Sequence, residues 1–82
     1  MSLEEAREIF ERVSETDDVG QKRFLMFRAF EQVLSELEED SLEDLSGYLY
    51  KLSQDFLTSS STYEKTQKME KLLDYVERKY ES

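Results

Sequence analysis

Apolar side chains recur along the chain at alternating spacings of three and four residues, in four separate stretches. This spacing places the apolar side chains of a stretch on one face of an α-helix. The pattern predicts amphipathic helices over residues 3–15, 19–39, 42–57 and 62–80. The residues expected to face inward are Leu3, Ala6, Ile9, Phe10 and Val13 in the first helix, Met26, Phe27, Phe30, Val33, Leu34 and Leu37 in the second, Leu42, Leu45, Tyr48, Leu49, Leu52 and Phe56 in the third, and Thr66, Met69, Leu72, Leu73, Val76 and Tyr80 in the fourth.

A residue that can cap a helix stands just before or at the start of each stretch. The four pairs that resemble capping boxes are Ser2–Glu5, Asp18–Gln21, Ser41–Asp44 and Ser61–Glu64. In such a box the first side chain accepts a hydrogen bond from a free backbone N–H at the start of the helix. Because the intervening segments are short, consecutive helices are expected to be antiparallel neighbours. The sequence therefore predicts an all-α, up-down four-helix bundle that forms one domain over residues 1–82.

Two features leave the packing of this bundle open. The first helix is the shortest, so the alternative is a three-helix core with a loosely docked first helix. Gly47 falls inside the predicted third helix, where a glycine costs about 1 kcal/mol relative to alanine. Either a partner approaches the helix closely at Gly47 or the fold tolerates the residue.

The composition narrows the chemistry that the chain can perform. The chain has 82 residues and a net charge of −9, and it contains no histidine, cysteine or proline. Without histidine and cysteine, zinc sites and disulfides are excluded, and no side chain titrates near neutral pH unless it is strongly perturbed. The negative charge argues against nucleic-acid binding, because phosphate groups are repelled.

The chain also lacks the features of a membrane or secreted protein. No apolar run approaches the roughly 20 residues that cross a bilayer, and the acidic N-terminal sequence is unlike a secretory signal. We expect a cytoplasmic protein with no membrane contact, no metal, no cofactor and no evident small-molecule substrate.

Two short motifs resemble those of known families. Asp40-Ser41-Leu42 resembles the phosphopantetheine attachment motif of acyl carrier proteins, which are also small, acidic and four-helical. The resemblance implies a carrier role for Ser41, although a predicted helix stands where that family has a long loop. Glu4, Glu5 and Glu8 resemble the first half of the magnesium motif of MazG-like nucleotide pyrophosphohydrolases. The second half of that motif is missing, so these acids are interpreted as a solvated first turn.

Cations lie among the most apolar residues of the chain in one stretch, KRFLMFRAF, at residues 22–30. On a helix at 100° per residue, Phe24 and Leu25 fall outside the apolar stripe. A neighbouring helix could cover them, another molecule could, or the helical phase could differ near the start. If another molecule does, the contact residues are Arg23, Phe24, Leu25 and Arg28, with Tyr50 on the outer face of the third helix, because arginine and aromatic residues are enriched at interfaces.

The sequence therefore predicts a small acidic protein that is not an enzyme and that acts in protein–protein interaction or regulation. A helix face would dock onto a protein partner or onto a second copy, and a homodimer is plausible for so small a core. The alternative is an acidic inhibitor or nucleic-acid mimic that presents residues 31–44 to a basic protein. An acyl-carrier-like role for Ser41 is the third interpretation.

Overall fold

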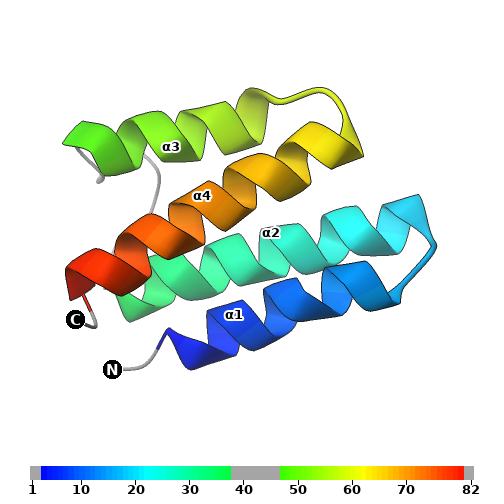
Figure 1. Ribbon diagram of the computed structural model, residues 1–82, viewed down its shortest axis with the longest axis horizontal. Helices are drawn as coiled ribbons and strands as arrows, with labels where there is room; N and C mark the ends of the chain where they lie inside the picture. Colours follow the sequence, from blue (N-terminus) through cyan, green and yellow to red (C-terminus); the bar gives the residue numbers. More distant parts are fainter. Residues whose placement is uncertain (1–2, 38–46, 81–82) are drawn as a thin grey trace.

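The computed structural model describes residues 3–37 and 47–80 and confirms the all-α fold. The chain forms α1 (Glu4–Glu11), a 3-10 helix η1 (Arg12–Glu15), α2 (Val19–Glu36), α3 (Gly47–Thr58) and α4 (Thr62–Tyr80). The four α-helices alternate in direction (Figure 1). None of the helices in the described ranges is long and apolar enough to cross a membrane.

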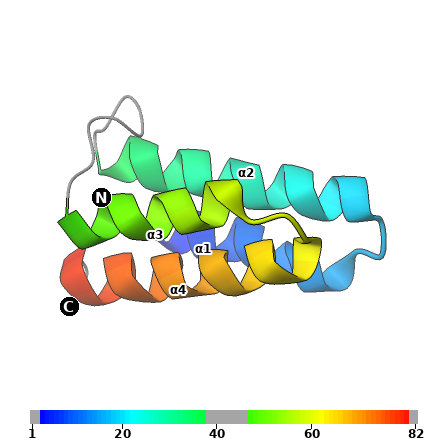
Figure 2. The same cartoon turned by 90° about the horizontal axis from the view of Figure 1, so that it is seen from above.

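The helices enclose a common centre. Seen from the α3 side, α2 and α4 lie to either side of α3, and α1 lies behind it (Figure 2). Along their lengths α1 packs against α2 and α3 packs against α4, while α2 also packs against α4. The consecutive pairs α1–α2 and α3–α4 are thus hairpins that close on one another through α2 and α4.

Local sequence accounts for where the helices begin. The side chain of Asp18 accepts a hydrogen bond of 3.3 Å from the backbone N–H of Gln21. Ser61 Oγ accepts one of 3.0 Å from the backbone N–H of Glu64. Two of the four predicted caps are thereby confirmed; the other two depend on Ser2 and Ser41, which lie outside the described residues.

The core draws on every helix, so the first helical segment is a full member of the bundle. Leu3, Ala6, Phe10 and Val13 are buried, and the alternative of a three-helix core with a loosely docked first helix is wrong. The other buried apolar residues are Met26, Ala29, Phe30 and Val33 of α2, Leu49, Leu52 and Phe56 of α3, and Met69, Leu72, Leu73 and Val76 of α4.

Three aromatic residues that the pattern predicts to face inward are partly exposed. The exposed fraction is 38% for Phe27, 50% for Tyr48 and 43% for Tyr80. Tyr48 instead packs edge-on against Tyr75, with ring centroids 5.1 Å apart. These residues stand at the borders of their stripes, where the position of the neighbouring helix sets how much of a ring is covered. Leu42 and Leu45 lie outside the described residues.

Gly47 is the first residue of α3 in the described part of the chain. The predicted start of this helix, at residue 42, lies outside the described residues. Its φ angle is +61°, in the left-handed region. A Cβ atom at this position would meet nothing within 4 Å, so the restriction comes from the backbone and not from a neighbour. The left-handed φ angle by itself accounts for a glycine at this position, so close approach of a partner is not needed to explain it.

Gly47→Ala is expected to lower the free energy of unfolding by about 1–2 kcal/mol, because an L-residue is strained in the left-handed region. Gly20→Ala is the matched control, since Gly20 lies in the first turn of α2 and an added Cβ makes only ordinary contacts at 3.8 Å. The control should leave stability unchanged or raise it by up to about 1 kcal/mol. Urea unfolding followed by circular dichroism measures both; equal effects of the two substitutions would contradict the prediction.

Candidate functional site

The exposed side of α2 carries two phenylalanines and an arginine on one face. Phe24 is 53% exposed, and the guanidinium carbon of Arg28 lies 5.8 Å from the centroid of its ring. Phe27, one turn along, is 38% exposed. Spacings of three and four residues bring these side chains together on a helix. We call Phe24, Phe27 and Arg28 the α2 aromatic face.

One side of the α2 aromatic face is held by the core. The Phe27 ring lies 5.5 Å from the buried ring of Phe56 on α3. The ammonium nitrogen of Lys65 on α4 lies 5.5 Å from the centroid of the same Phe27 ring. Because Phe27 is fixed between α3 and α4, the face presents a pre-formed apolar surface rather than a loose side chain.

Arg23 ties α2 to the loop between α3 and α4 and to the first residue of α4. Its Nε donates a hydrogen bond of 3.2 Å to Thr62 Oγ1, and its Nη2 donates one of 3.2 Å to the Ser60 carbonyl. Neither Arg23 nor Arg28 pairs with an acid in the described part of the chain, where the ion pairs are those of Arg7 and Lys51.

The remaining predicted contact residues are placed elsewhere. Leu25 is partly buried and packs against the core, so a neighbouring part of the protein covers much of it. Tyr50 is partly exposed on α3, where its hydroxyl accepts a hydrogen bond of 2.7 Å from Gln54 Nε2. Of the five residues, the structure brings Phe24 and Arg28 into direct contact. Their role in binding stays a prediction.

Sequence reasoning missed Lys65, the buried cation behind the α2 aromatic face. Lys65 is 5% exposed, and its Nζ donates hydrogen bonds of 3.1 Å and 3.3 Å to the carbonyls of Phe56 and Leu57. These carbonyls lie in the last turn of α3 and have no partner within that helix. Burial, with the nearby charge of Arg23, lowers the pKa of Lys65. The signal in the sequence is its spacing of four from Met69, on the apolar stripe of α4.

A second unpredicted cluster fastens α1 to α4. The Arg7 guanidinium contacts Glu70 at 2.7 Å, Asp74 at 3.0 Å and Glu77 at 2.6 Å. The hydrogen bonds to Glu77, followed by the one to Glu70, raise the pKa of Arg7 above its ordinary value. The three acids recur at spacings of four and three along one face of α4, and the cation that they share comes from a helix far away in sequence.

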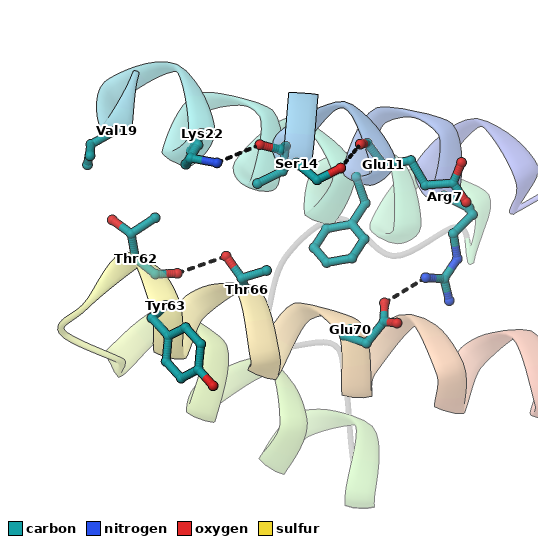
Figure 3. A pocket seen from close by; sticks show the side chains of 11 residues that line it. Arg7, Glu11, Ser14, Val19, Lys22, Thr62, Tyr63, Thr66 and Glu70 are labelled. Atoms are coloured by element: carbon teal, nitrogen blue, oxygen red, sulfur yellow. Dashed lines mark hydrogen bonds and ion pairs between the residues drawn. The ribbon is translucent and has the colours of Figure 1, made fainter. Parts of the chain in front are cut away.

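Beyond this cluster α1 and α4 leave a groove of about 600 Å³. Figure 3 shows it between the α1–η1 segment with the start of α2 on one side and the first turns of α4 on the other. Lys22 and Val19 stand at one end, and Arg7 and Glu70 at the other. The residues that line it are Arg7, Phe10, Glu11, Val13, Ser14, Val19, Lys22, Thr62, Tyr63, Thr66 and Glu70.

Metal binding gains no support from the described side chains. Within residues 3–37 and 47–80, no group of three or more acidic side chains is arranged to hold a metal ion. Glu4, Glu5 and Glu8 are exposed, and Glu5 accepts a hydrogen bond of 3.0 Å from Gln32. Ser41 and the acidic residues at 38–44 lie outside the described residues, so the predictions that rest on them stay predictions.

Comparisons of the chain with protein-family models, with curated proteins and with solved structures found no match.

Proposed function

We propose that this protein is a non-enzymatic interaction protein that docks through the α2 aromatic face. The observation that carries the proposal is the exposure of Phe24, a large apolar side chain left 53% exposed beside Phe27 and Arg28. Aromatic residues and arginine are the side chains most often found at the energetic centre of protein interfaces. Burial of such a ring against a partner contributes favourable free energy that the isolated chain does not gain.

A second copy of the chain is the occupant that the charges favour. Glu31 is exposed. It lies on the same face of α2, one turn beyond Phe27 and Arg28. When two such helices pack antiparallel about a two-fold axis, one residue set meets its own copy, so Arg28 of one chain can pair with Glu31 of the other. The face is thus complementary to itself in both apolar surface and charge.

The other functions have no such support among the described residues. The acidic-mimic interpretation depends on residues 31–44 as a continuous row of carboxylates, and only 31–37 of these are described. The carrier interpretation depends on Ser41. We therefore put forward docking through the α2 aromatic face alone.

The test is the molar mass in solution across a range of protein concentrations, measured by sedimentation equilibrium. The wild-type chain is expected to dimerise, and Phe24→Ser to weaken the dimer by at least about tenfold, as for a central interface residue. Tyr63→Ser is the matched control, because Tyr63 is 73% exposed but lies on α4, outside the face. Its dimer affinity should equal that of the wild type.

A charge exchange tests the pairing itself. Arg28→Glu and Glu31→Arg should each weaken the dimer, because each places like charges opposite one another. The double variant Arg28→Glu/Glu31→Arg should recover affinity toward the wild-type value. A wild-type chain that is monomeric at every concentration, or a Phe24→Ser variant that dimerises as tightly as the wild type, would refute docking of a second copy through this face.

A further inference from the structure

The groove between α1 and α4 has the size and lining of a small-molecule site. Its volume of about 600 Å³ falls within the range of typical ligand pockets. Its walls are mainly apolar: Phe10, Val13 and Val19 come from the α1–η1 segment and the start of α2, and Tyr63 and Thr66 come from the first turns of α4. Tyr63 is the most exposed of the large hydrophobic side chains that the structure describes, at 73%.

The charged side chains of the groove differ in whether an ion pair or water already neutralises them. Arg7 and Glu70 pair with each other at 2.7 Å, and Arg7 also contacts two further acids of α4. Glu11 is exposed to water. Charges that are paired or hydrated attract a ligand only weakly, because the partner or the water screens them.

Lys22 is the exception among them. It is partly buried, and its Nζ donates one hydrogen bond of 2.8 Å, to the Val13 carbonyl. An ammonium group has three donors, and in the described ranges the ion pairs are made by Arg7 and Lys51 and not by Lys22. Arg23 adds a second positive charge at the same end, since it donates to Thr62, which lines the groove. This end of the groove therefore favours an anion.

We propose that the groove binds a small amphipathic carboxylate, with the carboxylate on Lys22 Nζ and an apolar tail along Phe10, Val13 and Tyr63. A charge-assisted hydrogen bond to a partly desolvated ammonium orients the ligand, and the apolar walls bind its tail. A free small molecule fits better than a peptide helix. The wall from Arg7 to Ser14 is only roughly 10 Å long, which is about two helical turns. A peptide helix short enough to match that length is unstable by itself.

The experiment is a titration of the full chain, followed by backbone amide NMR, with three ligands of equal chain length: octanoate, octylammonium and 1-octanol. Octanoate is expected to bind at least roughly fivefold more tightly than octylammonium, because only the anion can accept from Lys22. The perturbed amides should lie in residues 7–22 and 62–70, and not on the α2 aromatic face.

Variants separate the head group from the tail. Lys22→Gln should weaken octanoate binding roughly five- to tenfold and leave octanol unchanged, whereas Lys22→Arg should retain the preference for the anion. Lys71→Gln is the matched control, because Lys71 is exposed on α4 away from the groove. Tyr63→Ser should weaken all three ligands alike, since it removes an apolar wall.

Three results of the titrations with these ligands and variants would overturn the proposal. One is octylammonium binding as tightly as octanoate, which would assign the head group to the acidic end of the groove. Another is a Lys22→Gln variant that keeps its wild-type amide spectrum and its full affinity for octanoate. The last is a set of shifts confined to Phe24 and its neighbours, which would place the ligand on the α2 aromatic face. Binding of an acidic amphipathic peptide in preference to octanoate would likewise replace the small-molecule assignment.

Discussion

Phe56→Ala is expected to destabilise the fold by about 3–5 kcal/mol, the usual range for the loss of a fully buried phenylalanine. Phe56 is fully buried, and its ring centroid lies 5.5 Å from those of both Phe27 and Phe30. The Lys65 ammonium nitrogen lies 5.3 Å from the same ring. The substitution would therefore open a cavity where α2, α3 and α4 meet.

A loss of this size approaches the total stability of a small domain, which is about 5–15 kcal/mol. The variant should be largely unfolded near 37 °C, and urea unfolding monitored by circular dichroism would show the change. Phe24→Ala is the matched control: it makes the same chemical change at a half-exposed position and should cost less than about 1 kcal/mol. A Phe56→Ala variant as stable as Phe24→Ala would contradict the described core.

Lys65→Met is expected to destabilise the protein by about 1–3 kcal/mol at neutral pH, because the Phe56 and Leu57 carbonyls lose a buried donor. Methionine keeps most of the apolar stem of the lysine, so the change isolates the ammonium group. Ser59 Oγ also donates to the Phe56 carbonyl, at 2.7 Å, and so offsets part of the loss there. Lys71→Met, at an exposed position of the same helix, should change stability by less than about 0.5 kcal/mol.

The effect of Lys65→Met should also depend on pH. Burial lowers the pKa of Lys65 in the folded protein below its ordinary value of 10.5. Between those two pKa values the unfolded chain binds more protons than the folded one, so stability rises with pH. Methionine does not titrate, so the stability gap between wild type and variant should widen as pH is raised toward 10.5. Unfolding free energies measured at pH 7 and near pH 10 test this; a gap that narrows would show that the folded state favours the charged amine.

The helix predictions agree best with the structure where neighbouring residues alone define an element. The fourth helix spans residues 62–80 as predicted, because Ser61 caps its start and the apolar stripe runs through to Val76. The second begins at Val19 as predicted, after the Asp18 cap. The first narrows into a 3-10 helix from Arg12, and the third begins at Gly47 in the described part of the chain. The change to a 3-10 helix at Arg12 has no signal in the apolar periodicity, and the predicted start of the third helix lies outside the described residues.

The α2 aromatic face was only partly predictable. Helical phase alone placed Phe24 beside Arg28 and outside the apolar stripe, and the cation–π contact between them agrees with that. The same reasoning grouped Leu25, Arg23 and Tyr50 with them. The packing separates these three, because the core covers Leu25, the α3–α4 loop engages Arg23, and Tyr50 lies on another helix bonded to Gln54.

By itself the sequence determined the helical class, the capped starts of α2 and α4, and most of the buried stripe. These features depend on side chains within about four positions of one another, so periodicity and capping chemistry reveal them. In the Arg7 cluster, Arg7 contacts three acids of α4 that follow it in the sequence by 63, 67 and 70 positions. Lys65 bonds to carbonyls eight and nine positions away on another helix. The α1–α4 groove and the partners of Arg7 and Lys65 arise from how the helices pack on one another, and no local pattern encodes that geometry.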